Sequence, residues 1–448
     1  MKKVILSLLC CGLCMVAMAQ TSRQEIDARP YGIIPTMTVY TGQVYTMPEA
    51  VAPKGYKPVY MTGYARHGSR FESRDIYPLE TYTYFRKAAE HNLLTPLGKR
   101  VKEYMDWYYE YHKLRRGDLT RVGYEQHKGI GGRFGKRLSP LFGGDVLVRS
   151  VSSTRMRSTM SMVAFVEGLK EQNPRLRTDM ESTERDMALV RPQSDCNPQF
   201  PEHERDAYYD FLDDVVFKKL IEWGEKQDLS HAEQALFTEP ARFFALFDDS
   251  RFKIMANIYR RLAFVQNFGN NDRTLLNEVF TSDEQYVMYQ HDNCAWYYRS
   301  ASAAHPILAN VVSKSRILFD HFVTKADAAL QGKNDAVADL CFGHDYFIVP
   351  LVTLLGVDGL PLSLGKGRES IECVSEVWRG YKITPMAANL MLVLYRGKGD
   401  ADVLVRVLLN ERDVTLPLDA QAPHFYKWDD VKRLMYDRLN EVERMKKQ

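Results

Sequence analysis

The sequence has almost no excess charge of either sign. Its 448 residues include 60 Lys and Arg and 57 Asp and Glu, which gives a formal net charge of +3. Proteins that coat nucleic acids or anionic membranes need an excess of basic side chains to neutralise phosphates. The balance therefore argues against both partners, and any anion that this protein binds must bind in a local pocket.

The sequence also lacks a hydrophobic run long enough to span a membrane comfortably, which takes about 20 residues. Its N-terminal apolar stretch, residues 4–19, follows two lysines and ends in Ala17-Met18-Ala19. A basic start, a short apolar stretch and a small-x-small site are typical of a secretory signal peptide. We therefore expect a protein that is cleaved after Ala19, is periplasmic or secreted, and keeps no membrane anchor.

Cysteine is scarce, with 7 in the whole sequence, and three of these lie in the predicted signal peptide. The mature chain keeps Cys196, Cys294, Cys341 and Cys373, an even number that allows up to two disulfides in an oxidising compartment. None of them forms a CxxC pair, which argues against a zinc ribbon or a redox motif. Buried free thiols are an equally good interpretation.

Internal repeats and low-complexity tracts are absent, which excludes solenoids and long linkers. Hydrophobic residues make up 45% and charged residues 26% of the chain, so an ordinary globular protein with a sizeable core is expected. The length allows two or three compact units, or one large domain with an insertion.

Three segments share one pattern, in which an apolar run that favours a strand is followed by a polar loop and a helical pattern. These segments are residues 59–70, 145–169 and 337–355. The succession predicts an α/β sheet. Ligands of such sheets bind at the carboxyl ends of the strands, where the three loops would meet.

Other segments complete this outline of the fold. Thr95 and Thr120 are predicted to cap the starts of two helices. Aromatic and charged residues at helical spacing predict a helical insertion over residues 186–325. Two apolar runs, residues 390–395 and 403–409, predict a hairpin at the edge of the sheet.

The loop after the first predicted strand reads Arg66-His67-Gly68-Ser69-Arg70. Guanidinium groups match phosphate oxygens bidentately, and two neighbouring cations favour the neutral imidazole, whose lone pair is then available for attack. Gly68 allows the backbone to pass close to a bound anion. The loop therefore indicates a nucleophilic histidine at a phosphate site; a surface histidine among solvated arginines is the alternative.

This loop resembles the signature of the histidine phosphatase superfamily, and its extended form resembles branch 2, the histidine acid phosphatases and phytases. Two later segments agree, namely Arg157 with Ser161 on a predicted helix and His344-Asp345 after the third strand. Several motifs in the right order make coincidence improbable. Residues 385–411 are most similar to the multiple inositol-polyphosphate phosphatases.

The resemblance implies a fold and a division of the chain. The expected fold is α/β, with a mostly parallel sheet flanked by helices, a phosphoglycerate-mutase-like core, and an inserted α-helical cap domain. Residues 28–185 and 326–448 would form the catalytic domain, and residues 186–325 would form the cap.

The resemblance also implies roles for individual residues. His67 would attack phosphorus and form a phosphohistidine that water hydrolyses, and Asp345 would protonate the leaving alkoxide. A carboxyl group beside phosphate anions is protonated more readily, which suits this role at mildly acidic pH. The phosphate oxygens would be bound by Arg66, Arg70, Arg157 and His344.

Two features depart from the family pattern. Animal inositol-polyphosphate phosphatases typically carry His-Ala-Glu, whereas this chain has His344-Asp345, so the predicted proton donor is an aspartate. The family often has proline after the second arginine, but here Arg70 is followed by Phe71-Glu72-Ser73-Arg74. Arg74 falls where some phytases place a basic substrate contact, and it is our candidate specificity residue; a solvated charge at a helix start is the alternative. No metal or cofactor is expected. Three further histidines fit no common metal-ligand spacing and are interpreted as surface or packing residues: His91, His112 and His127.

The sequence therefore predicts an exported, monomeric phosphomonoesterase that acts on inositol polyphosphates such as phytate. The alternative is a histidine acid phosphatase of broad specificity for sugar phosphates or other small monoesters. A non-catalytic phosphate-binding protein is disfavoured, because a binder needs the arginines but neither His67 nor Asp345.

Overall fold

The structure is a computed structural model that describes residues 21–28, 34, 36–40, 50–191, 197, 200–270, 272–365, 368–399 and 402–447. The predicted signal peptide and Cys196 lie outside these residues. Cys294, Cys341 and Cys373 are free thiols, so the interpretation without disulfides holds for these three. Within the described ranges, no helix has the length and apolar character needed to cross a bilayer.

One sheet of eight strands organises the described residues, in the order β3-β2-β4-β1-β5-β6-β7 with β8 paired to β6. Its parallel half consists of β1 (Lys57–Arg66), β2 (Leu147–Ser152), β3 (Arg177–Glu181) and β4 (Ala336–Gly343). Its antiparallel half consists of β5 (Asn389–Arg396), β6 (Leu404–Leu409), β7 (Arg412–Asp413) and β8 (Phe425–Lys427). The expected α/β class is confirmed, with a sheet that is mixed.

The predicted C-terminal hairpin forms from β5 and β6, but its expected place at the edge of the sheet is wrong. β5 pairs with β1 on its other side, and β6 pairs with β7 and β8. Seven of the eight residues of β5 are buried. A strand that is covered on both faces reads as a continuous apolar run, and such a run suits the interior of a sheet better than its edge.

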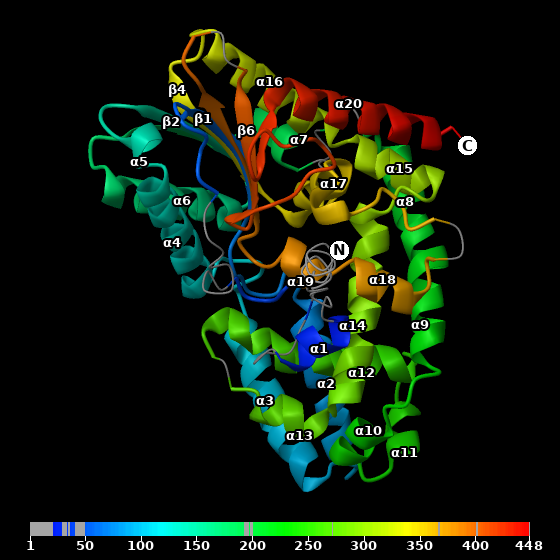
Figure 1. The fold of residues 1–448 in the computed structure, drawn as a ribbon. Helices are drawn as coiled ribbons and strands as arrows, with labels where there is room; N and C mark the ends of the chain where they lie inside the picture. The colour runs from blue at the N-terminus through cyan, green and yellow to red at the C-terminus, as the bar shows by residue number, and fades with distance from the viewer. Residues whose placement is uncertain are drawn as a thin grey trace, which may run out of the picture.

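Helices cover both faces of the sheet (Figure 1). The face that carries Met61 and Ala65 of β1 packs against α4 (Arg121–Arg137), α5 (Ser139–Phe142) and α6 (Met156–Gln172). The face that carries Tyr60 and Tyr64 packs against α7 (Met187–Val190), α15 (Pro306–Ser313), α16 (Arg316–Leu330), α17 (Asp345–Leu354) and α20 (Trp428–Met445). These two pairs of residues alternate along β1, as the pleat of a strand requires.

A helical lobe lies below the sheet in Figure 1. Its separate apolar core is shared by α2 (Ile76–Glu90), α3 (Pro96–His112), α10 (Ser230–Leu236), α11 (Pro240–Phe244), α12 (Arg251–Phe264), α13 (Thr274–Val279) and α14 (Ser282–Trp296). The lobe therefore combines two separate parts of the chain, because α2 and α3 precede residue 186. The domain boundaries at residues 186 and 325 stay a prediction.

Shorter helices connect these parts of the fold. They are α1 (Ser22–Asp27), α8 (Glu202–Phe211), α9 (Lys218–Gly224), α18 (Ile371–Val377) and α19 (Gly380–Ile383). Both predicted helix starts are confirmed: Thr95 Oγ1 accepts a hydrogen bond from the Gly98 amide at 2.9 Å, and Thr120 Oγ1 accepts one from the Gly123 amide at 3.2 Å.

Helices α4 and α6 approach one another closely because glycines line their contact. A β-carbon at Gly131 would lie 2.0 Å from the carbonyl oxygen of Phe165, and one at Gly168 would lie 2.0 Å from the carbonyl oxygen of Lys128. Helix α6 begins one residue before Arg157. The close contact therefore fixes the position of α6 against α4, and with it the position of Arg157 at the start of α6.

We expect Gly131→Ala to destabilise the fold by about 1–3 kcal/mol, because the new methyl group forces two helix backbones apart. Gly132→Ala is the matched control, since its β-carbon would lie 3.7 Å from the nearest atom, the Gly168 carbonyl oxygen. That control should gain up to about 1 kcal/mol from helix propensity. Urea unfolding checks both, and equal changes in the two variants would contradict the proposed crowding.

Candidate active site

The three predicted loops meet at the carboxyl ends of neighbouring parallel strands. Arg66 at the end of β1 lies opposite Gly343 of β4, and Ser152 of β2 lies opposite Phe342 of β4. The strand order β2-β4-β1 therefore brings together loops that are far apart in the sequence. This convergence, which the sequence predicts, is confirmed.

The imidazole of His67 is held in one orientation. Its Nδ1 lies 2.9 Å from the carbonyl oxygen of Gly68, and its backbone amide donates to the Gly343 carbonyl at 2.9 Å. Because a carbonyl oxygen only accepts, Nδ1 carries the proton and Nε2 keeps its lone pair. His67 is 3% exposed, so this ring presents an unprotonated nitrogen inside a nearly closed site.

Neighbouring side chains hold the loop that carries His67. The amide of Gly68 donates to Ser161 Oγ at 3.0 Å, and the amide of Ser69 donates to Gln126 Oε1 at 2.8 Å. His127 Nε2 lies 2.8 Å from the carbonyl oxygen of Arg66 and donates to it. The sequence predicts His127 at the surface or in packing and does not indicate this hydrogen bond to the nucleophile loop.

Gly68 is required by close approach of the backbone. A β-carbon there would lie 2.3 Å from the carbonyl oxygen of Gly123 in α4. The loop consequently passes directly over the start of that helix. The sequence explanation, in which Gly68 lets the backbone pass close to a bound anion, stays a prediction; the close neighbour that the structure shows is helix α4.

Burial and surrounding cations lower the pKa of His67 well below its usual range. After burial, the largest effects come from Arg157 and Arg66, followed by His344 and Arg70. Burial lowers the pKa of Arg157 to about 9, and Arg70 adds to that effect, so Arg157 remains charged at neutral and acidic pH. His67 therefore stays neutral in mild acid, where an ordinary histidine would be protonated.

We expect Arg157→Met to raise the pKa of His67, because its strongest neighbouring cation is removed. Less His67 is then neutral at low pH, so the acidic limb of the profile of kcat/KM against pH moves to higher pH. Arg155→Met, which removes an exposed charge beside α6, is the control and should leave the limb in place. A limb that moves equally in both variants would show that Arg157 has no special effect on His67.

Arg66 connects the nucleophile loop to Asp345. Its Nη2 lies 3.1 Å from Asp345 Oδ2, and its Nη1 donates to the carbonyl oxygens of Thr384 at 2.8 Å and Pro385 at 3.1 Å. Burial lowers the pKa of Arg66, and the Asp345 carboxylate opposes that effect. The guanidinium group thus orients the carboxyl group of Asp345 at the end of the nucleophile strand.

His344 and Asp345 occupy the start of α17, where His344 is the N-cap residue. The His344 ring lies 5.4 Å from the His67 ring between centroids, and its Nε2 lies 3.2 Å from Ser153 Oγ. Burial, followed by Arg157, lowers the pKa of His344 well below its usual range. His344 is therefore neutral and offers one N–H donor beside the nucleophile.

Two arginines outside the sequence motifs also act electrostatically on residues at the start of α17. Arg191, directly after α7, acts on His344 and Tyr346. Arg299 lies in the π-helix η5 (Tyr297–Ala301), directly after α14; burial lowers its pKa, but Tyr346, Tyr208 and Asp345 raise it, and the pKa is raised on balance. Neither belongs to a recognisable motif, so only the folded chain places them here.

Arg74 is exposed just before α2, and in the described part of the chain it forms no ion pair. Its role in specificity stays a prediction. His91 is exposed, whereas His112 is buried and its ring centroid lies 4.0 Å from that of Tyr108. Across the described residues, no three His, Cys, Asp or Glu side chains cluster in a way that could hold a metal ion.

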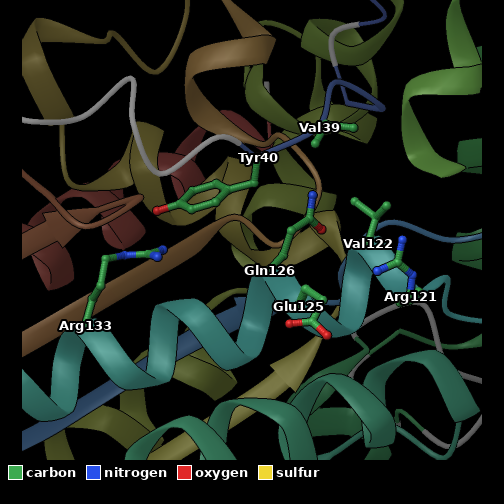
Figure 2. A pocket seen from close by; sticks show the side chains of 7 residues that line it. All are labelled: Val39, Tyr40, Arg121, Val122, Glu125, Gln126 and Arg133. Atoms are coloured by element: carbon green, nitrogen blue, oxygen red, sulfur yellow. The ribbon is translucent and has the colours of Figure 1, made fainter. Parts of the chain in front are cut away.

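A cavity of about 370 Å³ lies beside α4. Figure 2 shows Gln126 and Arg133 of α4 beside it, together with Tyr40. Arg133 is already paired with Glu411 by two hydrogen bonds of 2.9 and 2.7 Å. None of the predicted site residues lines this cavity, which touches the nucleophile loop only through Gln126.

Solved structures share this fold. A Bifidobacterium longum multiple inositol polyphosphate phosphatase in complex with inositol hexasulfate aligns with a TM-score of 0.71 and 19% identity, covering 92% of this chain and 98% of that chain. A phytase from D. castellii aligns with a TM-score of 0.66 and 15% identity, covering 96% and 88%. A Hafnia alvei phytase aligns with a TM-score of 0.53 and 13% identity, covering 88% and 99%. No curated protein sequence matches this chain.

The model of the histidine phosphatase superfamily (branch 2) matches residues 64–410. That range contains the loop of His67, helix α6 with Arg157, and the start of α17 with His344 and Asp345. The match covers well over half of the chain. The chain therefore belongs to branch 2 of the histidine phosphatase superfamily and is a phosphatase of the histidine acid phosphatase family.

Proposed function

We propose that the protein removes phosphate from inositol polyphosphates such as phytate. The observation that carries this proposal is a surplus of cations without a carboxylate partner that act on His67, His344 or Asp345. Four arginines have no carboxylate within 4.0 Å among the described residues: Arg70, Arg157, Arg191 and Arg299. A single phosphate group carries at most two negative charges near neutral pH, so this surplus favours a substrate with several phosphates.

A cavity of about 420 Å³ beside α12 is the space that we propose for the remaining phosphates of such a substrate. None of the predicted site residues lines it; its charged lining consists of Lys253, Arg260, Arg261 and Arg299 together with Glu72, Glu80 and Asp292. Arg260 is paired with Asp292, and Arg261 Nε lies 3.5 Å from Glu72 Oε1, whereas Arg299 forms no ion pair with a described carboxylate. The similarity to a phosphatase named for inositol polyphosphates, in complex with inositol hexasulfate, supports the same substrate class.

The first step would transfer the phosphoryl group to His67. Nε2 attacks phosphorus, the P–O bond to the inositol oxygen breaks, and the carboxyl proton of Asp345 moves to the leaving oxygen. Arg66, Arg70, Arg157 and His344 would stabilise the charge on the remaining phosphate oxygens, which is the main catalytic demand in phosphoryl transfer. The product of this step is a phosphohistidine.

The second step would release phosphate. Water attacks the phosphorus of phosphohistidine, the N–P bond breaks, and the Asp345 carboxylate accepts the proton of the water. His67 returns to its neutral form, which its low pKa favours. The mechanism therefore needs one nucleophile and one proton carrier, the roles that we propose for His67 and Asp345.

We also propose that the protein is exported as a periplasmic or secreted enzyme. The support is the N-terminal sequence, with two lysines, a short apolar stretch and Ala17-Met18-Ala19. N-terminal sequencing of protein recovered from the periplasm or medium should begin at Gln20. A chain that keeps residues 1–19 would refute cleavage at this position.

Turnover of phytate and of glucose 1-phosphate by the same preparation tests the substrate class. We expect a higher kcat/KM for phytate, and Arg299→Ala should raise the KM for phytate by about tenfold or more, with a smaller effect on glucose 1-phosphate. Poor phytate hydrolysis beside fast sugar-phosphate hydrolysis would instead establish a histidine acid phosphatase of broad specificity. Binding of phytate with no turnover of either substrate would indicate a non-catalytic protein.

A further inference from the structure

Tyr64 is a fully buried tyrosine on β1, two residues before Arg66. Its ring packs edge-on against Phe347 of α17, with the ring centroids 5.4 Å apart and an interplanar angle of 74°. Tyr64 belongs to none of the motifs that identify the active site. Its hydroxyl group nevertheless lies where two segments of that site meet.

The hydroxyl group forms two short hydrogen bonds with backbone atoms. It accepts from the amide of His344 at 2.7 Å and donates to the carbonyl oxygen of Val190 at 2.7 Å. His344 is the residue before Asp345, and Val190 is the residue before Arg191. One oxygen atom on the nucleophile strand thus ties the turn that carries Asp345 to the segment that carries Arg191.

The atoms of this junction pack closely around Gly343. A β-carbon at Gly343 would lie 2.1 Å from the Tyr64 hydroxyl oxygen and 2.2 Å from the Val190 carbonyl oxygen. Helix α17 has no side-chain cap at its N-terminus, where His344 has extended backbone angles. Among the described residues, the His344 amide donates its hydrogen bond to the Tyr64 hydroxyl.

We propose that Tyr64 is a positioning residue that holds His344 and Asp345 at the distance from His67 that leaving-group protonation requires. Without the hydroxyl group, the buried amide of His344 and the buried carbonyl of Val190 lose their partner, and the turn must move to recover one. A small displacement of Asp345 weakens proton transfer more than it weakens phosphate binding, because proton transfer depends on hydrogen-bond geometry. This inference rests on the proposed role of Asp345 as proton donor.

The same strand provides a matched control. Tyr60 is also fully buried, lies on the same face of β1, and donates its hydroxyl hydrogen bond to Asp339 Oδ2 at 2.8 Å. It is four residues farther from the active-site end of the strand than Tyr64. Tyr60→Phe and Tyr64→Phe therefore each remove one buried hydroxyl group from β1, but only the second removes a partner of the site.

The experiment compares phytate, which has a poor alkoxide leaving group, with p-nitrophenyl phosphate, whose leaving group needs little protonation. We expect Tyr64→Phe to lower the ratio of kcat on phytate to kcat on p-nitrophenyl phosphate by about tenfold. Tyr60→Phe should leave that ratio at the wild-type value. Melting temperatures of both variants report the loss of stability separately from the loss of activity.

An unchanged ratio in Tyr64→Phe, or an equal fall in both variants, would overturn the inference and leave Tyr64 with a structural role. Asp345→Asn in the same assay separates the two proposals. If it lowers the ratio while Tyr64→Phe does not, the donor role stands and the positioning role fails. If Asp345→Asn leaves the ratio unchanged, the donor role fails, and the positioning role fails with it. Should Tyr64→Phe not fold, fluorotyrosine at position 64 keeps the ring and tests the same ratio through a weakened acceptor.

Discussion

Replacing His67 with alanine is expected to lower kcat by about 10³-fold or more, both on phytate and on p-nitrophenyl phosphate. The imidazole supplies the attacking lone pair, which its hydrogen bond from Nδ1 to Gly68 directs to Nε2. The arginines around it are untouched, so inositol hexasulfate should still bind with a dissociation constant within about tenfold of the wild-type value. Steady-state kinetics and calorimetry measure the two quantities.

Rapid quenching of the reaction, in acid or in base, tests the predicted phosphohistidine intermediate. Wild-type protein mixed with substrate should yield an acid-labile, base-stable phosphoenzyme, and His67→Ala should yield none. His91→Ala, which removes an exposed histidine at the end of α2, is the control and should behave as wild type. Activity of His67→Ala within tenfold of the wild type would refute the phosphohistidine mechanism.

Asp345→Asn is expected to lower kcat on phytate by about 10²–10³-fold and kcat on p-nitrophenyl phosphate by less than tenfold. Asparagine keeps the shape of the side chain and still accepts a hydrogen bond from Arg66, but it cannot donate a proton to an alkoxide. The p-nitrophenolate ion is a weak base and leaves without one. Kinetics on a series of phenyl phosphates should therefore show a stronger dependence on leaving-group basicity in the variant.

Asp339→Asn is the control for this second prediction. Asp339 is a buried carboxylate on the same strand that precedes Asp345, and it accepts hydrogen bonds from Tyr60 at 2.8 Å and Asn334 at 2.7 Å. Its replacement should lower stability without changing the dependence on the leaving group. Equal losses on phytate and p-nitrophenyl phosphate in Asp345→Asn would remove Asp345 from the donor role.

The convergence of the three loops could be predicted from the sequence because it follows from general geometry. Each loop comes directly after a strand, and parallel strands end at one edge of a sheet. His67, Arg157 and His344 are therefore placed near one another by topology alone. The short spacing of the motifs then suffices to identify most of the residues around the nucleophile.

Which arginines lack a carboxylate partner could not be predicted in the same way. Arg299 and Arg133 look alike in the sequence, yet Arg133 is neutralised by Glu411, 278 positions away, and Arg299 has no carboxylate partner among the residues that the structure describes. Whether a guanidinium group is free depends on tertiary contacts that no local pattern records. For the same reason, the amphipathic patterns of α2 and α3 predict helices without indicating which apolar core they join.

The role that we propose for Tyr64 could not be predicted from the sequence either. A tyrosine in an apolar strand is an ordinary core residue by composition, and burial of its ring agrees with that interpretation. Its importance arises from two backbone groups that approach it from segments after residue 189. Such a junction is visible only once the strand, the turn and helix α7 are in place.

The position of β1 between β4 and β5 has a consequence for how the chain folds. Both neighbours of β1 come from the C-terminal third of the sequence. β1 is therefore made early but has no neighbouring strand to pair with until that third of the chain is available. Pairings between such distant segments slow folding, because a long loop must close before they form. Phosphatase activity should consequently appear late in refolding and together with the last step of sheet formation, and fragments that end before residue 389 should be inactive.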